Sequence, residues 1–247
     1  MYPRQEQQPV SLAEAIAQAR REAQLEYERM PDMGHEPTRR AHAELVNQIA
    51  NDIVLRRQNR QFVIDDNNRK ILQFLLLYFN NSPLAEEVFP ERNYKLHKNI
   101  LLMGPVGSGK TLLMKIFSEY LRITGNPRMF HNLSVTQMVN YYTLHNNLDR
   151  YTFNEESGKG FCINPVNICL NDIGVQTTSF FGMDTRRLVD EFLLARNDIW
   201  MQHHKFAHLT TNLNIEQLKE TFYDNFDRLI DRFKTYNVIT LEGDSRR

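Results

Sequence analysis

The sequence predicts an α/β fold in which a parallel sheet is flanked by helices. From Asn99 onward, short apolar runs of strand length alternate with segments that carry apolar residues at helical spacing. This alternation is typical of parallel sheets, because each parallel strand needs a crossover connection to return the chain. A glycine-rich stretch, Gly104–Thr111, directly follows the first of these strands. Upstream of Asn99, further segments with helical spacing predict a small N-terminal helical domain.

Composition restricts the classes of protein that this chain can represent. The 247 residues suffice for one large domain or for a core with an appendage. Lys plus Arg and Asp plus Glu each total 30, so any nucleic acid must bind to a local patch. The longest apolar run, Ile71–Phe79, is too short to span a bilayer, and the N-terminus lacks a signal-peptide core. Because Cys162 and Cys169 have no partners at metal-ligand spacing, we expect reduced thiols in a cytoplasmic protein that binds no membrane.

Two amphipathic helices are predicted in the first sixty residues. Ser11–Glu14 forms a capping box, and apolar residues follow at helical spacing to about Arg29. A second apolar stripe contains Leu45, Ile49 and Ile53 and ends before the basic stretch 56–60. These narrow stripes favour a partner helix pair, and packing on the rest of the chain is the alternative. We therefore expect a helical partner-binding region over 1–60, a linker and helix over 61–98, and the main domain over 99–247.

The main domain is expected to alternate strands and helices in a regular order. An apolar helix, Asn68–Phe79, leads into it after a short extended piece. The predicted strands are Asn99–Met103, Met129–Asn132, Val166–Leu170, Phe206–Thr210 and Val238–Leu241. The predicted helices are Thr111–Leu121, Val135–Leu144, Thr185–Met201, Ile215–Thr221 and Asp224–Phe233.

The stretch Gly104–Thr111 fits the phosphate-loop pattern G-x-x-x-x-G-K-[ST] at every position. Glycines let backbone N–H groups turn toward a triphosphate, the lysine neutralises the β- and γ-phosphates, and the threonine hydroxyl can bind Mg²⁺. A glycine-rich turn without a ligand is the alternative. The predicted nucleotide contacts are Gly104, Pro105, Val106, Gly107, Ser108, Gly109, Lys110, Thr111 and Leu112. We therefore expect ATP and Mg²⁺ as cofactors.

A phosphate loop needs an acidic partner at the end of a second buried strand, which holds the metal and orients water. The stretch Asn167–Gly174 supplies Asn171 and Asp172 after a run of apolar residues. The expected metal ligands are Thr111, Asn171 and Asp172. The first acidic position is occupied by a neutral amide, which predicts weaker metal binding or slower turnover. A strand end capped by an Asn-Asp turn is the alternative.

Two further residues are expected to act on the γ-phosphate. Asn212 follows the next strand, where a polar side chain can sense the phosphate. Arg232 lies on a later helix, four residues after Arg228, where it could reach the nucleotide of a neighbouring subunit as a finger. A solvated helix face is the alternative for this arginine pair. The expected catalytic set is therefore Asp172, Asn212 and Arg232.

The order of phosphate loop, acidic strand, sensor asparagine and arginine helix resembles the AAA+ ATPases. Asp172–Thr177 together with Asp231 and Arg232 resembles the DnaC-type helicase loaders, and the resemblance covers roughly 99–247. It implies an N-terminal helical domain that docks on a DnaB-type replicative helicase, with ATP turnover as a release switch. It also implies self-association in a ring or spiral, and a second sensor at Arg246 or Arg247. The family has an aspartate where this chain has Asn171, which again predicts slow hydrolysis.

The resemblance further implies an element that contacts single-stranded DNA, since DnaC-like proteins and DnaA initiators share an extra helical element after the second strand. The matching region, Ser134–Phe153, interleaves aromatic and basic or protonatable side chains. They are Tyr141, Tyr142, His145, Arg150, Tyr151 and Phe153. Bases stack on such rings with little sequence preference. Because tyrosine and phenylalanine at helical spacing are often core residues, core packing is the alternative.

Two other functions fit some of the same motifs. A transposition helper of the IstB type shares the ATPase core and assembles on DNA with a transposase. A remodelling ATPase would share the phosphate loop and the apolar helix after it, but not Gly174–Gln176. A GTPase is disfavoured because the sequence contains no N-K-x-D or T-K-x-D motif for guanine.

Overall fold

The computed structural model describes residues 11–155, 163–174, 185–222 and 231–243. Within these ranges, five parallel strands form one sheet in the order β2-β3-β4-β1-β5. The strands are β1 (Asn99–Met103), β2 (His131–Ser134), β3 (Ile168–Ile173), β4 (Ala207–Thr211) and β5 (Tyr236–Thr240). The α-helices are α1 (Leu12–Glu28), α2 (Glu36–Gln58), α3 (Asp66–Phe79), α4 (Lys110–Ile123), α5 (Val135–His145), α6 (Thr185–His203) and α7 (Ile215–Thr221), and short 3₁₀ turns cover Pro83–Glu87 and Asp149–Tyr151.

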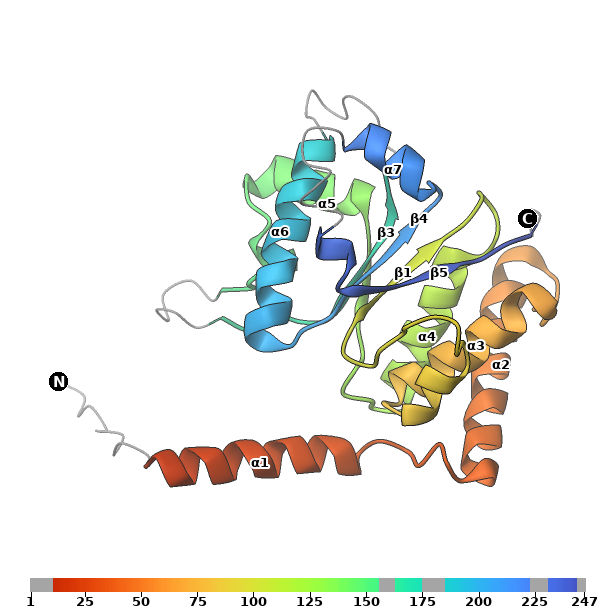
Figure 1. Ribbon diagram of the computed structural model, residues 1–247. Coiled ribbons are helices and arrows are strands. Elements are labelled where there is room, and N and C mark those ends of the chain that lie inside the picture. The colour runs from red at the N-terminus through yellow and green to blue at the C-terminus, as the bar shows by residue number, and fades with distance from the viewer. Residues whose placement is uncertain (1–10, 156–162, 175–184, 223–230, 244–247) are drawn as a thin grey trace.

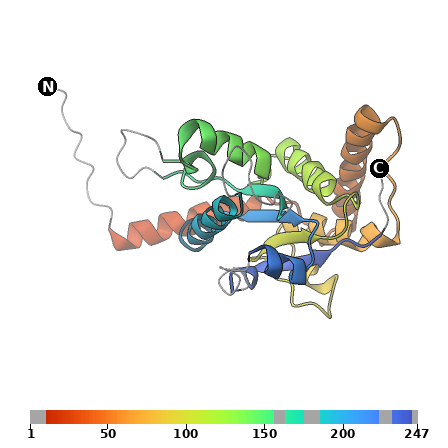
Figure 2. The ribbon, with the colours of Figure 1, turned by 90° about the horizontal axis from the view of Figure 1, so that it is seen from above.

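The sheet is the middle layer between two groups of helices (Figures 1 and 2). Side chains of β1 alternate between the two faces, as expected of a strand that is buried on both sides. Ile100 and Leu102 pack in one cluster with α2, α3 and α4, and Leu101 and Met103 pack in a second cluster with α5, α6 and α7. The predicted α/β fold with a parallel sheet flanked by helices is therefore confirmed.

Several strand boundaries differ from the predicted ones. The strand β3 begins at Ile168 instead of Val166 and continues to Ile173, so that it includes Asn171 and Asp172. The reason for the late start is Asn167, whose side chain accepts from Phe206 N–H and donates to the Met129 carbonyl, which ties three chain segments together ahead of the sheet. The strands β2 and β4 likewise begin later than predicted, and β5 begins two residues earlier. The predicted helix 224–233 lies mostly outside the described residues.

The helix α2 is packed into the core, so the expectation that its stripe is open to a partner is wrong. Ile49 is buried, and Leu45 and Ile53 are partly buried against the same cluster. His42 Nδ1 lies 2.7 Å from the hydroxyl of Tyr120 on α4. The outer face of α4 carries large apolar side chains, and α2 is the element that covers them. This burial stabilises α4 itself rather than an appended module.

The helix α1 differs from α2 in its surroundings. In Figure 1 it lies apart from the layered core, to which residues 29–35 connect it. Its predicted capping box is present, because Ser11 N–H donates to Glu14 and Glu14 N–H donates to the Ser11 hydroxyl. The side chain of Ile16 is 45% exposed. The core begins with Met33, which is buried and whose carbonyl accepts from Arg39.

Among the helices in the described ranges, none is long and apolar enough to cross a membrane.

Candidate nucleotide-binding site

The phosphate loop leaves the carboxyl end of β1, which lies between β4 and β5 in the sheet, and runs into α4. Gly104 has φ +148°, and a Cβ there would lie 2.1 Å from the carbonyl oxygen of Leu241. Gly109 has φ +101° at the N-cap of α4, a conformation that side chains other than glycine rarely adopt. The helix begins at Lys110, one residue before the predicted start at Thr111. The two glycines therefore permit the sharp turn that points the helix N-terminus into the loop.

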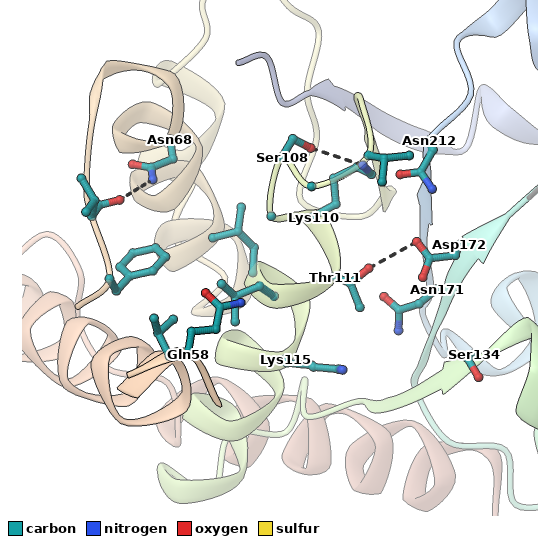
Figure 3. Close-up of a pocket in the computed structure, with 18 of the residues that line it drawn as sticks. Gln58, Asn68, Ser108, Lys110, Thr111, Lys115, Ser134, Asn171, Asp172 and Asn212 are labelled. Atoms are coloured by element: carbon teal, nitrogen blue, oxygen red, sulfur yellow. Dashed lines mark hydrogen bonds between the residues drawn. The ribbon is translucent and has the colours of Figure 1, made fainter. Parts of the chain in front are cut away.

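Lys110 is held inside this loop. Its Nζ donates to the carbonyls of Gly104 and Pro105 at 2.8 Å each and to Ser108 Oγ at 3.2 Å. The residue is only 3% exposed, so the ammonium lies in the hollow of the loop and not in bulk solvent (Figure 3). An ammonium in this position favours an anion that enters the loop, because the helix N-terminus and the loop N–H groups add to its positive potential.

A cavity of about 980 Å³ opens beside the loop. Its lining includes the loop from Val106 onward, the ends of β3 and β4, and a segment of chain ahead of α3. That segment contains Phe62 and Val63, which sequence reasoning did not assign to the site. Asn51 accepts from the Phe62 N–H, and Asn68 donates to the Val63 carbonyl. The available signal was the short extended piece predicted ahead of this helix, and in the structure that piece ends at the N-cap Asp65.

Asp172 reaches the phosphate loop through an irregularity in the sheet. Leu170 pairs with Leu209 and Ile173 pairs with Thr211, so Asn171 and Asp172 together oppose the single residue between them on β4. This is a β-bulge, which re-aims side chains at functional sites. Asp172 has φ +63°, and its carboxylate accepts from the Thr111 hydroxyl at 3.4 Å (Figure 3). The strand therefore does not end in a simple Asn-Asp turn.

Asn171 lines the same cavity, but its amide group is held within the sheet. Its Nδ2 lies within hydrogen-bond distance of three acceptors, namely Asn132 Oδ1, the Leu133 carbonyl and the Cys169 carbonyl, at 3.1 to 3.4 Å. Its Oδ1 accepts from the Thr210 hydroxyl at 3.4 Å. The residue is 3% exposed. Contacts within the sheet therefore account for the polar atoms of Asn171. Its predicted role as a metal ligand stays a prediction.

The donor set fits a nucleotide with a hard metal ion. A hydroxyl and a carboxylate, from Thr111 and Asp172, face one another across the cavity edge, and such oxygen ligands suit Mg²⁺. The described residues hold no group of three or more His, Cys, Asp or Glu side chains that could bind a metal by themselves. A metal ion here would therefore take its remaining ligands from phosphate oxygens and water, as Mg²⁺ does in nucleotide sites.

Asn212 follows β4 directly and lines the cavity, with its side chain pointing toward the phosphate loop (Figure 3). The order β3-β4-β1 places the ends of these strands side by side, so Asp172, Asn212 and the loop meet at one edge of the sheet. The structure thus brings together two members of the expected catalytic set with the loop.

Arg232 is not among the cavity-lining residues. Its Nη1 donates to Asp190 Oδ1 on α6 at 3.2 Å, and the two side chains are 13% and 18% exposed. The arginine is therefore held within its own subunit in this conformation. Arg228, Arg246, Arg247 and Val175–Thr177 lie outside the described residues.

The comparisons with known proteins concern the fold. No protein-family model matches the sequence, and no curated protein matches it. Among solved structures, a candidate primosome component from Streptococcus pyogenes serotype M3 is 18% identical, covers 75% of this chain and 85% of its own, and has a TM-score of 0.52. The two proteins share a fold.

Two DnaA structures are more distant in shape. AMPPCP-bound DnaA from Aquifex aeolicus is 17% identical over 74% of this chain, with a TM-score of 0.47. The replication initiator DnaA bound to AMPPCP and single-stranded DNA is 17% identical over 74% of this chain, with a TM-score of 0.49. The present chain spans about half the length of each of these DnaA chains.

The aromatic residues after β2 form a compact group on α5 and the following turn. The rings of Tyr141 and His145 lie 4.3 Å apart, those of Tyr141 and Tyr151 lie 4.9 Å apart, and the Arg150 guanidinium lies 6.0 Å from the Tyr151 ring. Tyr142 and Tyr151 are both partly buried against the core cluster that contains β3 and α6. The predicted DNA contacts are therefore divided, because two of the tyrosines pack on the core, and Tyr141 meets His145 in a tilted contact and Tyr151 in an edge-to-face contact.

Proposed function

We propose that this protein is an ATP-binding, Mg²⁺-dependent ATPase of the AAA+ class that acts in DNA replication as a DnaC-type loader of the replicative helicase. One observation carries the ATPase part of the proposal. The ends of β1, β4 and β3, which are neighbours in the sheet, present Lys110 with its loop, Asn212 and Asp172 around one cavity. A site at the carboxyl ends of parallel strands is the usual place for nucleotide chemistry in such sheets.

The residues of the site have distinct roles in ATP hydrolysis. Lys110 and the loop N–H groups bind the β- and γ-phosphates, and Thr111 with Asp172 would hold Mg²⁺, which neutralises charge on the phosphates when bound. Asp172 orients the attacking water and takes its proton. The water oxygen forms a bond to the γ-phosphorus, and the bond from that phosphorus to the bridging oxygen of ADP breaks. Asn212 donates to the γ-phosphate and fixes its position.

Turnover is expected to be slow. One carboxylate, Asp172, has to serve both the metal and the water, because the neighbouring position is the neutral Asn171. Arg232 completes the site from an adjacent subunit in a ring or spiral, which requires it to leave Asp190. Slow turnover suits a release switch, in which ATP binding sets one state of the assembly and hydrolysis ends it.

Partner binding is assigned to α1 and to the aromatic group on α5. The helix α1 lies apart from the core and contains the exposed Ile16, so it can pair with helices of a DnaB-type helicase. Tyr141, His145, Arg150 and Tyr151 form a group of rings and cations that suits single-stranded DNA, together with Phe153. The fold shared with a candidate primosome component is compatible with this role in replication, and a transposition helper of the IstB type, which shares the ATPase core, is the alternative.

A capture experiment tests the loader function. The full chain, a variant that lacks residues 1–28, and Lys110→Ala are each mixed with the replicative helicase of the source organism and ATP. We expect the full chain to capture the helicase and the truncation to lose capture while keeping its melting temperature, because α1 lies off the core.

Two results would contradict the proposal. A folded truncation that captures the helicase as well as the full chain would remove the role of α1. Binding of a transposase, with no capture of the helicase at any ATP concentration, would favour the transposition helper.

A further inference from the structure

The position of the Asp172 carboxylate depends on the β-bulge between Leu170 and Ile173 in β3. Between the paired residues Leu170/Leu209 and Ile173/Thr211, β3 advances by one residue more than β4. Asp172 sits in the left-handed region at φ +63°, which residues with a Cβ adopt far less readily than glycine. An aspartate in a regular strand would instead alternate faces and send its side chain away from Thr111.

Thr210 is the residue that lies opposite this bulge. The Asp172 N–H donates to Thr210 Oγ1 at 2.9 Å, and the same hydroxyl donates to Asn171 Oδ1 at 3.4 Å. Thr210 is completely buried, so water does not replace either bond. A bulge leaves an N–H without its ladder partner, and here the threonine hydroxyl takes the place of that partner. One side chain therefore contacts both residues of the bulge.

The adjacent residue Thr211 holds the other side of the bulge. Its hydroxyl donates to the Ile173 carbonyl at 2.8 Å and accepts from the Leu213 N–H at 3.1 Å. In the sequence, Asn212 lies between Thr211 and Leu213. The end of β3 and the loop that carries Asn212 are therefore joined through consecutive hydroxyl groups of β4.

We propose that Thr210 is a positioning residue for the nucleotide site: its buried hydroxyl fixes the bulge in β3 and thereby sets the Asp172 carboxylate against Thr111. Thr210 is not among the residues that line the cavity. The proposal rests on the proposed ATPase function, since it names the residue that places the acid of that site. Without this hydroxyl, the peptide N–H of Asp172 loses its hydrogen bond to Thr210, and the bulge has a reason to relax toward a regular strand. Displacement of a catalytic group by about 1 Å can lower a rate by about 100-fold.

The test uses a pair of substitutions at this position. Thr210→Val keeps the shape of the side chain and removes both hydrogen bonds, and Thr210→Ser keeps the hydroxyl. Thr124→Val is the matched control, because the Thr124 hydroxyl also donates to a backbone carbonyl, at 2.9 Å, but at the far end of α4. Asp172→Asn provides the effect of losing the carboxylate itself. For each protein, calorimetry measures the affinity for ATP with and without Mg²⁺, and a second assay measures ATP turnover.

We expect Thr210→Val to lose most of the Mg²⁺-dependent gain in ATP affinity, as Asp172→Asn does, and to lose about 10- to 100-fold in turnover. Affinity without Mg²⁺ should stay near that of the natural protein, because the loop and Lys110 are unchanged. Thr210→Ser should keep both properties within about threefold, and Thr124→Val should keep both unchanged. Rescue by serine separates positioning from a general loss of stability, which both valine variants would share.

Two outcomes distinguish failure of this proposal from failure of the proposed function. If Asp172→Asn removes the Mg²⁺ effect but Thr210→Val retains it, Thr210 does not position the acid. If Asp172→Asn itself leaves both Mg²⁺ dependence and turnover unchanged, the acid of the site is wrong, and the role of Thr210 is overturned with it.

Discussion

The two halves of the proposed nucleotide site are built in different ways. The phosphate loop is a run of consecutive residues whose shape follows from its own glycines, and Lys110 is bound by carbonyls of the same run. The acidic half is assembled from β2, β3 and β4, and Asp172 reaches the loop through a bulge supported by Thr210. A motif can specify the first half by local chemistry. The second half depends on the register between strands that are distant in sequence, so its substitutions should affect stability and function together.

The largest expected effect belongs to the loop. Lys110→Ala should weaken ATP binding by about 2 to 3 kcal/mol, or roughly 100-fold, since a charged donor to the phosphates is removed. The melting temperature should change little, because the loop is closed by its glycines and by the start of α4. Calorimetry and thermal unfolding measure the two quantities. Unchanged ATP affinity in a folded Lys110→Ala protein would mean that this loop is not the nucleotide site.

Asn171→Asp should show the opposite pattern. The amide nitrogen faces three acceptors, and a carboxylate in its place has no proton to donate to them. We expect a loss of about 1 to 3 kcal/mol in the free energy of unfolding, instead of the gain in Mg²⁺ affinity that the motif predicts. Urea unfolding measures the loss, with Asp172→Asn as the comparison. A variant that keeps its stability and turns over ATP faster would restore the motif-based interpretation.

Acid should lower the free energy of unfolding through His208 in the sheet, and it should leave the contacts of the phosphate loop unchanged. Burial, together with Arg128 and Arg196, lowers the pKa of His208 on β4 to about 3 from its usual value of about 6.5. The unfolded chain therefore takes up this proton first, so stability that is present above pH 6.5 is lost as the pH falls toward 3. At about 1.4 kcal/mol per pKa unit, the loss from this residue reaches about 2 kcal/mol at pH 5.

Burial also lowers the pKa of His42, which acts in the same direction. Unfolding curves at pH 7 and pH 5 measure the combined slope. His208→Asn should flatten this slope, because asparagine takes up no proton in this pH range. The asparagine oxygen can still accept from the Ile100 N–H that His208 Nδ1 now binds, so this hydrogen bond is kept. An equal slope in this variant would assign the acid sensitivity to other groups.

The smallest effect on stability is expected at the subunit edge. Asp190→Asn should cost about 1 kcal/mol, since it removes the charge from one partly buried pair. Its effect on turnover should be larger and positive, because Arg232 is then freer to reach a neighbouring nucleotide. Arg232→Ala should lower turnover, and mixing it with Lys110→Ala subunits should restore part of it. Glu191→Gln, which breaks the exposed pair with Arg187 on the same helix, is the control. No recovery in co-assembled mixtures would remove the finger role of Arg232.

Much of the fold was predictable because its signals are local. The strand Asn99–Met103 and the helix Ile215–Thr221 have the predicted bounds, and the predicted capping box at Ser11 marks a real helix start. Boundaries that depend on distant partners were predicted less well. The start of β3 at Ile168 is set by the contacts of Asn167 with other segments, which no local pattern contains.

The two N-terminal helices show the same limit. The stripes of α1 and α2 have similar apolar spacing, yet α2 covers α4 and α1 lies apart from the core. Apolar residues at helical spacing predict that a helix has an apolar face, but they do not predict what that face contacts. Which of the two helices packs on the core depends on contact with the apolar surface of α4, and that contact forms only in the folded chain.

The sequence by itself determined the parallel α/β architecture, the phosphate loop and the residue types at its edge, because strand alternation and loop chemistry are properties of consecutive residues. Only the tertiary structure decided that Asp172 and not Asn171 faces Thr111, that Thr210 supports the turn between them, and that Arg232 is paired with Asp190. These relations depend on strand register and on helix packing. A shift of one residue in register exchanges the faces of a strand, and no spacing within a single segment records that shift.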